Sequence, residues 1–275
     1  MKFDKKLCIL HGNCQGEILA ALLSASPEFN EAHEVEFYVN FSRQAIPAGS
    51  LKRCGLFLYQ RLGPQWGELA SESLLARLPK DAASMSYPNM FFKGYWPFWS
   101  SRPGFDYADS LLDGLLERGL TGAEIARVVL KGRLDRMFDL AGLLEETLAR
   151  EREKEHECHV KYVDMIEDGF RRERLFQSVN HPRRRLMLPA ADAVLALLGL
   201  PPLPEDFAQA CPELFTEFEL PIHPGVAAFH GLPFGGEGER YNVYGLSLTY
   251  AEYIGLYLEC KNAGRGDFGA FLKGA

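Results

Sequence analysis

The transition from an apolar run to a helical run near the start of the chain constrains the fold most strongly. Residues 6–11 read KLCILH, and a helical pattern follows over residues 16–25. A strand that is apolar almost throughout is typical of a parallel sheet covered on both faces. The linking residues 12–16 read GNCQG and place Cys14 between two glycines. The sequence therefore predicts an α/β unit whose first strand turns directly into a helix at a cysteine.

Further apolar and helical runs alternate along the chain, which favours a layered α/β fold with a parallel sheet. We expect further strands over residues 35–40, 54–60 and 175–180, and helices over residues 66–77, 184–198 and about 248–261.

The middle of the chain is different. Residues 106–170 are rich in Leu, Glu, Arg and Ala at helical spacing, and Thr121 followed by Glu124 matches a capping box. A long helix is expected over residues 133–155. We therefore predict a single α/β domain over residues 1–275, with a large helical insertion at about 106–170.

Composition limits the classes of partner. The 275 residues carry a net charge of −7, which does not favour a nucleic-acid-binding protein. No apolar run approaches the roughly 20 residues of a membrane span. The N-terminal apolar stretch is too short for a signal peptide, so we expect a cytoplasmic protein. The six cysteines are scattered, which predicts buried free thiols and no metal. The sequence leaves the oligomeric state open.

A cysteine at a strand-to-helix turn suits nucleophilic chemistry. The first turn of a helix presents unpaired N–H groups and favours negative charge, so a thiol there has a lowered pKa. The flanking Gly12 and Gly16 allow a tight turn and close approach of a substrate, and the N–H groups could hold an oxyanion. Alternatively, Cys14 is a small buried residue in a tight loop. The local sequence leaves both interpretations open.

A nucleophilic cysteine needs a base, and two histidines qualify. His181 follows a strand-like run and is preceded by Asn180, whose amide could orient the ring. His223 lies in the irregular Pro/Gly-rich tail of the chain. A third segment, HECH at residues 156–159, could bind a metal. However, neighbouring residues on a helix do not share a face, and we favour a solvated helix end.

Several polar residues could complete a site. Gln60 ends the third strand and can point into the same cleft as Cys14, or it can cap the following turn. Asn89 and Lys93 lie in the aromatic segment 86–97, most of whose rings we expect in the core. Arg183 and Arg184 begin a helix just after His181 and could hold phosphates, although surface charge is the simpler explanation.

Taken in chain order, these motifs resemble the WcbI-type polysaccharide-biosynthesis family. The resemblance covers most of the chain. Its motifs are Gly12-Asn13-Cys14-Gln15, Tyr59-Gln60, Tyr87-Pro88-Asn89, Asn180-His181-Pro182 and the tail from Leu220 to Val226.

The resemblance implies a fold related to the SGNH hydrolases, with Cys14 at the position of their serine, and coenzyme A binding. It also implies an O-acetyltransferase acting on a sugar of a capsular or other surface polysaccharide. SGNH enzymes often carry an aspartate shortly before their C-terminal histidine. Here only Glu219 precedes His223, and this departure favours His181 as the base.

The leading interpretation is thus transfer of an acyl group from acetyl-CoA to a sugar hydroxyl, with coenzyme A as a substrate and a sugar or glycan as the acceptor. Cys14 would either take the acyl group as a thioester or lie beside coenzyme A while the base activates the sugar hydroxyl. Asn13, Gln15 and Gln60 would support the oxyanion, assisted by Asn89 and Asn180. Gly12, Lys93, Arg183 and Arg184 would contact coenzyme A. Two alternatives remain: an esterase or thioesterase on the same scaffold, and a non-catalytic protein that binds a nucleotide-like ligand or a glycan.

Overall fold

The structure is a computed structural model that describes residues 5–103 and 105–275. Its described residues group into two compact units, each built from several stretches of the chain. Unit 1 comprises residues 5–90, 151–166 and 182–213, and unit 2 comprises residues 91–150, 167–181 and 214–275. The organisation as one domain over residues 1–275 stays a prediction.

Unit 1 is built on a parallel sheet of four strands in the order β2-β1-β3-β4. This confirms the α/β fold with a parallel sheet. The strands are β1 (Lys6–Gly12), β2 (His33–Val39), β3 (Cys54–Tyr59) and β4 (Ala83–Ser86). After β2 the chain crosses β1 and adds β3 on its other side. The carboxyl ends of β1 and β3 therefore flank the point at which the strand order reverses, where open α/β sheets bind their ligands.

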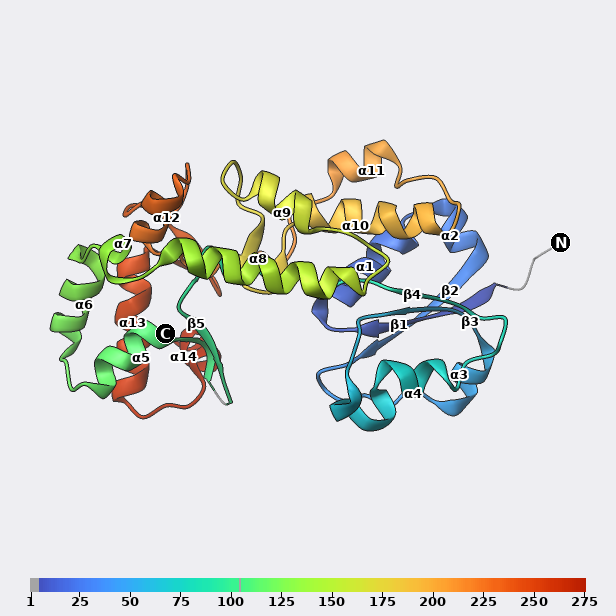
Figure 1. Ribbon diagram of the computed structural model, residues 1–275, viewed down its shortest axis with the longest axis horizontal. Coiled ribbons are helices and arrows are strands. Elements are labelled where there is room, and N and C mark those ends of the chain that lie inside the picture. The colour runs from blue at the N-terminus through green and yellow to red at the C-terminus, as the bar shows by residue number, and fades with distance from the viewer. Residues whose placement is uncertain (1–4, 104) are drawn as a thin grey trace. The chain divides into compact units, whose positions relative to one another are not determined.

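Helices cover both faces of this sheet, as Figure 1 shows. They are α1 (Cys14–Ser24), α2 (Pro27–Ala32) and α10 (Arg184–Leu197) on one face, with α3 (Ala48–Arg53) and α4 (Ser71–Leu75) on the other. Six of the seven positions of β1 are buried, with Ile9 and Leu10 completely so, and burial on both faces explains the apolar run from Leu7 to Leu10. Unit 1 also contains the 3₁₀ helix η1 (Pro64–Leu69) and α11 (Glu205–Ala210).

Two strand predictions need correction. The fourth strand of the sheet is β4, which the sequence analysis did not predict. The expected strand at 175–180 forms only β7 (Phe176–Ser178), which pairs with β8 (His181–Pro182) outside the four-stranded sheet. β4 was missed because it reads ASMS and is half-exposed, so it carries no continuous apolar run.

Helices fill the region expected as a helical insertion. They are α5 (Ser110–Glu117), α6 (Gly122–Lys131), α7 (Leu134–Met137), α8 (Leu140–His156) and α9 (Val163–Gly169). The capping box of Thr121 and Glu124 is present at the start of α6. The helix expected over residues 133–155 is divided between α7 and α8, because Phe138 has extended backbone angles.

Unit 2 holds the remaining elements, and much of its core is aromatic. The antiparallel pairs are β5 (Trp99–Arg102) with β6 (Phe105–Asp109), and β9 (Tyr241–Val243) with β10 (Leu246–Leu248); the helices include α12 (Pro224–His230), α13 (Tyr250–Asn262) and α14 (Phe268–Lys273). The rings of Phe92 and Tyr95 are fully buried and meet edge to face, which confirms the segment as core. Within residues 5–103 and 105–275, no helix has both the length and the apolar character needed to cross a bilayer.

Candidate functional site

An amide network joins the carboxyl ends of β1 and β3 in unit 1. The Oε1 atom of Gln60 accepts hydrogen bonds from the backbone N–H of Asn13 at 2.9 Å and from Nδ2 of Asn40 at 3.3 Å. Its Nε2 donates to Oδ1 of Asn13 at 3.0 Å and to the carbonyl of Pro88 at 3.3 Å. Both groups of the buried Gln60 amide are fully used, so this side chain fixes its neighbours in place.

The network extends to the loop after β4 through Asn89. Nδ2 of Asn13 and Nε2 of Gln15 donate to Oδ1 of Asn89 at 3.0 and 3.3 Å. Gln15 also exchanges two hydrogen bonds with the backbone of Met90, at 2.8 and 2.9 Å. Asn13 in turn caps α1, because its Oδ1 accepts from the N–H of Gln15 at 3.0 Å. The start of α1, the end of β3 and the loop after β4 are thus held as one polar cluster.

The two glycines beside Cys14 are explained by Tyr87. A Cβ atom added at Gly12 or Gly16 would collide with the Tyr87 hydroxyl, and at Gly16 also with Leu10 and Phe37. The hydroxyl lies 3.4 Å from the carbonyl oxygen of His11, to which it donates, and burial holds its pKa well above the usual range. These glycines therefore serve close packing between the helix start and Tyr87, a reason that differs from the tight turn expected from the sequence.

Cys14 is the first residue of α1 and is half-exposed, whereas the other five cysteines are buried. Burial raises the pKa of the thiols of Cys8, Cys54, Cys158 and Cys260. A raised pKa and a lack of access both suppress thiol reactivity. The structure thus places the accessible thiol of unit 1 at the start of a helix of 11 residues, beside the amide network.

The HECH segment pairs with the end of the edge strand β4. Nδ1 of His159 accepts from the N–H of Ser86 at 3.1 Å, and the N–H of His159 donates to the carbonyl of Ser86 at 3.0 Å. The Ser86 hydroxyl donates to the carbonyl of Glu157 at 3.1 Å. This segment therefore covers the end of the sheet. In the described ranges, His, Cys, Asp and Glu side chains form no group of three or more suited to a metal ion.

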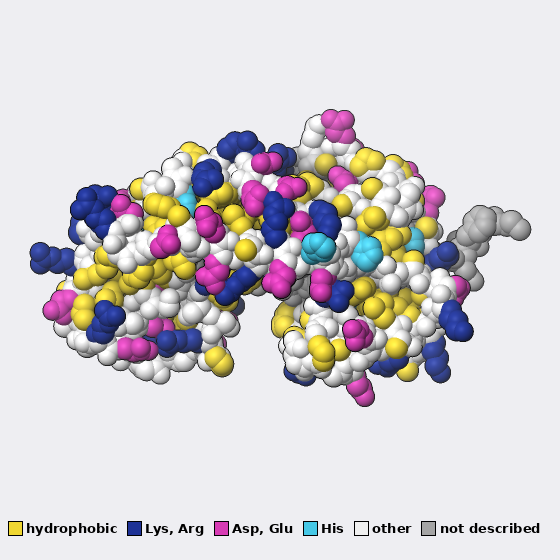
Figure 2. All heavy atoms as spheres, in the orientation of Figure 1, with side chains coloured by type: hydrophobic (Ala, Val, Ile, Leu, Met, Phe, Trp, Pro, Cys, Tyr) yellow, Lys and Arg dark blue, Asp and Glu magenta, His cyan; other side chains and the backbone are white. Residues whose placement is uncertain are grey.

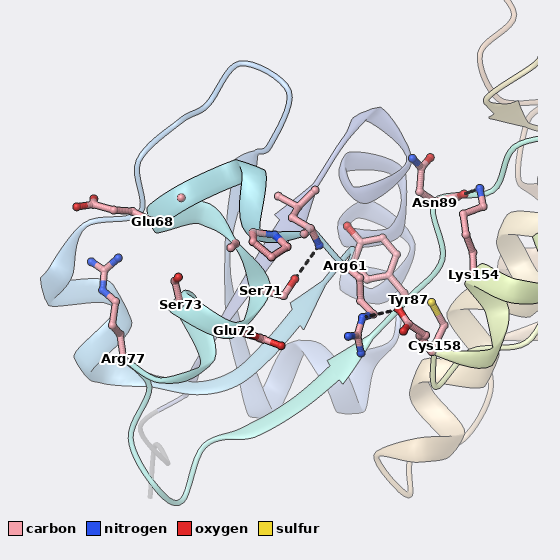
Figure 3. Close-up of a pocket in the computed structure, with 16 residues that line it drawn as sticks. Arg61, Glu68, Ser71, Glu72, Ser73, Arg77, Tyr87, Asn89, Lys154 and Cys158 are labelled. Atoms are coloured by element: carbon pink, nitrogen blue, oxygen red, sulfur yellow. Dashed lines mark hydrogen bonds and ion pairs between the residues drawn. The ribbon is translucent and has the colours of Figure 1, made fainter.

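A cavity of about 970 Å³ lies in unit 1 at the carboxyl ends of β3 and β4 (Figure 3). One wall comes from η1 and α4, and the other from the residues after β3 and β4 and from the end of α8. Asn89 lines the cavity and also bonds Asn13, so the cavity borders the amide network. Nζ of Lys154 donates to the backbone carbonyl of Asn89 at 3.0 Å.

His181, in unit 2, has the geometry of a base. Its Nδ1 lies 3.0 Å from the Ser178 hydroxyl, which also bonds Oδ1 of Asn180 at 3.3 Å. The ring stacks on Phe215 with centroids 4.5 Å apart. Its Nε2 has no hydrogen-bond partner in the described part of the chain. Burial lowers the pKa of His181, so the ring is neutral near pH 7. A fixed neutral ring with one open nitrogen is what a general base requires.

His223, also in unit 2, is held by both ring nitrogens. Nε2 donates to the carbonyl of Val129 at 2.9 Å, and Nδ1 accepts from the N–H of Gly225 at 2.8 Å, which caps α12. Burial lowers the pKa of His223 to about 4. Glu219 accepts from the N–H of Asn242 at 2.9 Å and lies 3.5 Å from Arg174. The hydrogen bonds of its ring to Val129 and Gly225 give His223 a structural role.

The basic residues proposed for phosphate contacts differ in their surroundings. Nε of Arg183 donates to Glu213 at 2.7 Å, and the other oxygen of this carboxylate accepts from the N–H of Arg184 at 2.8 Å. Glu213 thus takes the place at the start of α10 that a phosphate would need. Lys93 is half-buried, and burial followed by the charge of Arg150 lowers its pKa. In the view of Figure 2, basic and acidic side chains of the described residues are interspersed.

The structure therefore gathers Gly12, Asn13, Cys14, Gln15, Gln60 and Asn89 in unit 1. It places Lys93, Asn180, His181 and His223 in unit 2, while Arg183 and Arg184 belong to unit 1. Three further residues have roles that the sequence motifs do not reveal: Asn40, Tyr87 as the partner of the two glycines, and Lys154. Asn40 could have been found, since it ends a predicted strand as Gln60 does.

Comparisons with known proteins identify the family and the fold of this chain. The family model described as polysaccharide biosynthesis enzyme WcbI matches residues 7–203. A solved structure of WcbI, a polysaccharide biosynthesis enzyme, superposes with a TM-score of 0.80 at 20% identity, covering 98% of this chain and 94% of that one. That structure is described as the native protein without a disulfide bond between coenzyme A and Cys14. No curated protein sequence matches this chain.

Proposed function

The chain belongs to the family of WcbI polysaccharide biosynthesis enzymes, and from this premise we propose a specific reaction. We propose that it transfers an acetyl group from acetyl-CoA to a hydroxyl group of a capsular or other surface polysaccharide. The observation that carries the proposal is the half-exposed Cys14 at the start of α1, beside a fixed cluster of amides at the switch point of the sheet. The description of the WcbI structure, which refers to coenzyme A and Cys14, supports a coenzyme A site here.

The first step is acyl transfer to the enzyme. The Cys14 thiolate attacks the thioester carbonyl of acetyl-CoA, and a bond forms between Sγ and the acetyl carbon. The bond between this carbon and the coenzyme A sulfur breaks, and coenzyme A leaves as a thiolate that takes up a proton. The N–H groups of Gln15 and Gly16 already bond Asn13, so the positive end of the α1 dipole at its first turn stabilises the oxyanion formed on the way. Asn13, Gln15 and Asn89 hold this turn in position. Gln60 supports it, because both groups of its amide are engaged in hydrogen bonds.

The second step releases the acetyl group to the acceptor. A sugar hydroxyl attacks the acetyl-Cys14 thioester, a C–O bond forms, and the bond to Sγ breaks. His181 takes the proton from the hydroxyl through Nε2, while Ser178 and Asn180 fix its ring from the other side. His223 does not suit this role, because both of its nitrogens hold backbone groups.

Among the basic candidates, Lys93 is the phosphate contact of coenzyme A that its surroundings favour. It is half-buried and bonds no carboxylate within the described ranges, whereas the guanidinium of Arg183 is already paired with Glu213. A phosphate near Lys93 would offset the repulsion from Arg150. Arg183 and Arg184 could contact a phosphate of coenzyme A only if Glu213 moved away from them.

Turnover of acetyl-CoA with and without a glycan acceptor tests the proposal against its alternatives. The proposed transferase releases coenzyme A much faster with the acceptor and forms an acetylated glycan. A thioesterase releases it equally fast without the acceptor. A binding protein releases none, and a Cys14→Ala variant then behaves as the parent protein does. Either of the last two results would contradict the proposal.

A further inference from the structure

On one wall of the cavity beside the amide network, Ser71 accepts a hydrogen bond from the N–H of Leu62 at 2.8 Å, but four other polar side chains have no partner among the described residues. Glu68 on η1 and Glu72, Ser73 and Arg77 on or just after α4 line this wall (Figure 3). Within residues 5–103 and 105–275, none of these four side chains makes a hydrogen bond or an ion pair. The wall therefore offers two carboxylates, one hydroxyl and one guanidinium to a ligand.

The basic side chains of the opposite wall already have partners. Arg61 forms an ion pair with Glu157 at 3.0 Å, and Lys154 bonds the carbonyl of Asn89 and an oxygen of Glu151. The lining as a whole contains three cations, Arg61, Arg77 and Lys154, and three anions, Glu68, Glu72 and Glu157. A lining with balanced charge does not select for the several negative charges of coenzyme A, and the two unpaired carboxylates repel a phosphate.

A neutral ligand rich in hydroxyl groups matches this wall. Each sugar hydroxyl both donates and accepts, so neighbouring hydroxyls can donate to Glu68 or Glu72 and accept from Arg77. The volume of about 970 Å³ is at the upper end of the range of roughly 300–1,000 Å³ typical of small-molecule sites. It is ample for an oligosaccharide segment. Leu62, Pro64 and Tyr87 add apolar surface for the less polar faces of sugar rings.

We propose that this cavity of unit 1 binds the polysaccharide acceptor, as a neutral hydroxyl-rich segment held by Arg77, Glu72 and Ser73. The inference rests on the proposed function in one respect: that function makes the bound glycan the acceptor of the acetyl group. The contact between Asn89 and Asn13 joins the cavity to the start of α1, so a glycan bound there would end next to the elements that hold Cys14.

Binding of the intact protein to an array of bacterial surface oligosaccharides tests this site without any reaction. The parent protein is expected to bind neutral oligosaccharides, and Arg77→Ala and Glu72→Ala to weaken binding of the best of them at least tenfold. Arg118→Ala is the matched control, since Arg118 is exposed, makes no ion pair with a described residue and lies far along the chain in unit 2. It should bind as the parent does.

Calorimetry with coenzyme A separates the cavity from the donor site. Arg77→Ala should keep the parent affinity for coenzyme A within twofold. Absence of binding to every oligosaccharide, unchanged binding in Arg77→Ala, or loss of coenzyme A affinity in that variant would each overturn the inference. Oligosaccharide binding that depends on Arg77, in a protein that transfers no acetyl group, would instead overturn the proposed function and leave the glycan site standing.

Discussion

At the scale of single residues, Cys14 differs from the other five cysteines in its access to solvent and in its place at a helix start. Because burial raises the pKa of Cys8, Cys54, Cys158 and Cys260, these thiols should react slowly. We expect Cys14 to be alkylated first by limiting iodoacetamide, as peptide mapping would show. Cys158, which lines the cavity, is the internal comparison; faster labelling of Cys158 would refute the prediction.

The two histidines should respond differently to substitution. His181→Ala should lower the rate of acetyl transfer by about 10²–10⁴, the usual contribution of a base. His223→Ala should instead lower the free energy of unfolding by about 1–3 kcal/mol, because it leaves the carbonyl of Val129 and the N–H of Gly225 unpaired.

Transfer assays and urea denaturation of both variants check this pair of outcomes. The burial that lowers the pKa of His181 also keeps it neutral at mildly acidic pH. The rate should therefore fall only below the ordinary histidine pKa of 6.5. A near-normal rate in His181→Ala, together with a collapse in folded His223→Ala, would reverse the assignment.

At the scale of elements, the packing of α1 against the loop after β4 depends on the glycines beside Cys14. Gly12→Ala should lower the free energy of unfolding by about 1–3 kcal/mol, as overpacking does, because its Cβ meets the Tyr87 hydroxyl. Adding Tyr87→Phe should restore part of this loss. Gly16→Ala should be rescued less, because Leu10 and Phe37 also obstruct it.

Denaturant titration of these variants provides the measurement. The control is Gly49→Ala on α3, where an added Cβ meets nothing within 4 Å. That substitution should be neutral or slightly stabilising. If Gly12→Ala lowers the free energy of unfolding equally with and without the Tyr87 hydroxyl, the collision with this hydroxyl is not the cause of the loss.

Some of the strands could be predicted from the sequence alone, and others could not. β1 and β3 were predictable because burial on both faces requires long apolar runs, and Gln60 followed from the end of β3. β4 was not predictable, because a short, half-exposed edge strand needs no such run. The pairing of Tyr87 with Gly12 and Gly16, and of Asn89 with Asn13, joins residues more than 70 positions apart and leaves no local pattern.

At the scale of the whole molecule, buried neutral histidines link stability to pH. Burial lowers the pKa of His11, His223 and His230 to about 4, and all three are at most 7% exposed. Between pH 6.5 and 4 the unfolded chain binds protons that the folded chain does not. The free energy of unfolding should therefore fall on acidification through this window, by up to about 3 kcal/mol for each histidine.

Urea denaturation at pH values between 7.5 and 4.5 measures this dependence. His230→Phe should flatten it, whereas His156→Ala, which changes an exposed side chain, should leave it unchanged. A free energy of unfolding that stays constant from pH 7.5 to 4.5 would contradict the burial of neutral histidines.

The central claim of acetyl transfer through Cys14 can be tested by trapping the intermediate. The protein is mixed with acetyl-CoA without an acceptor, quenched in acid within the first turnover and digested for mass spectrometry. We predict an acetyl group on the peptide that contains Cys14, its removal when a glycan acceptor is added before quenching, and its absence in Cys14→Ser. No acetylated Cys14 in a protein that still acetylates the acceptor would contradict the account.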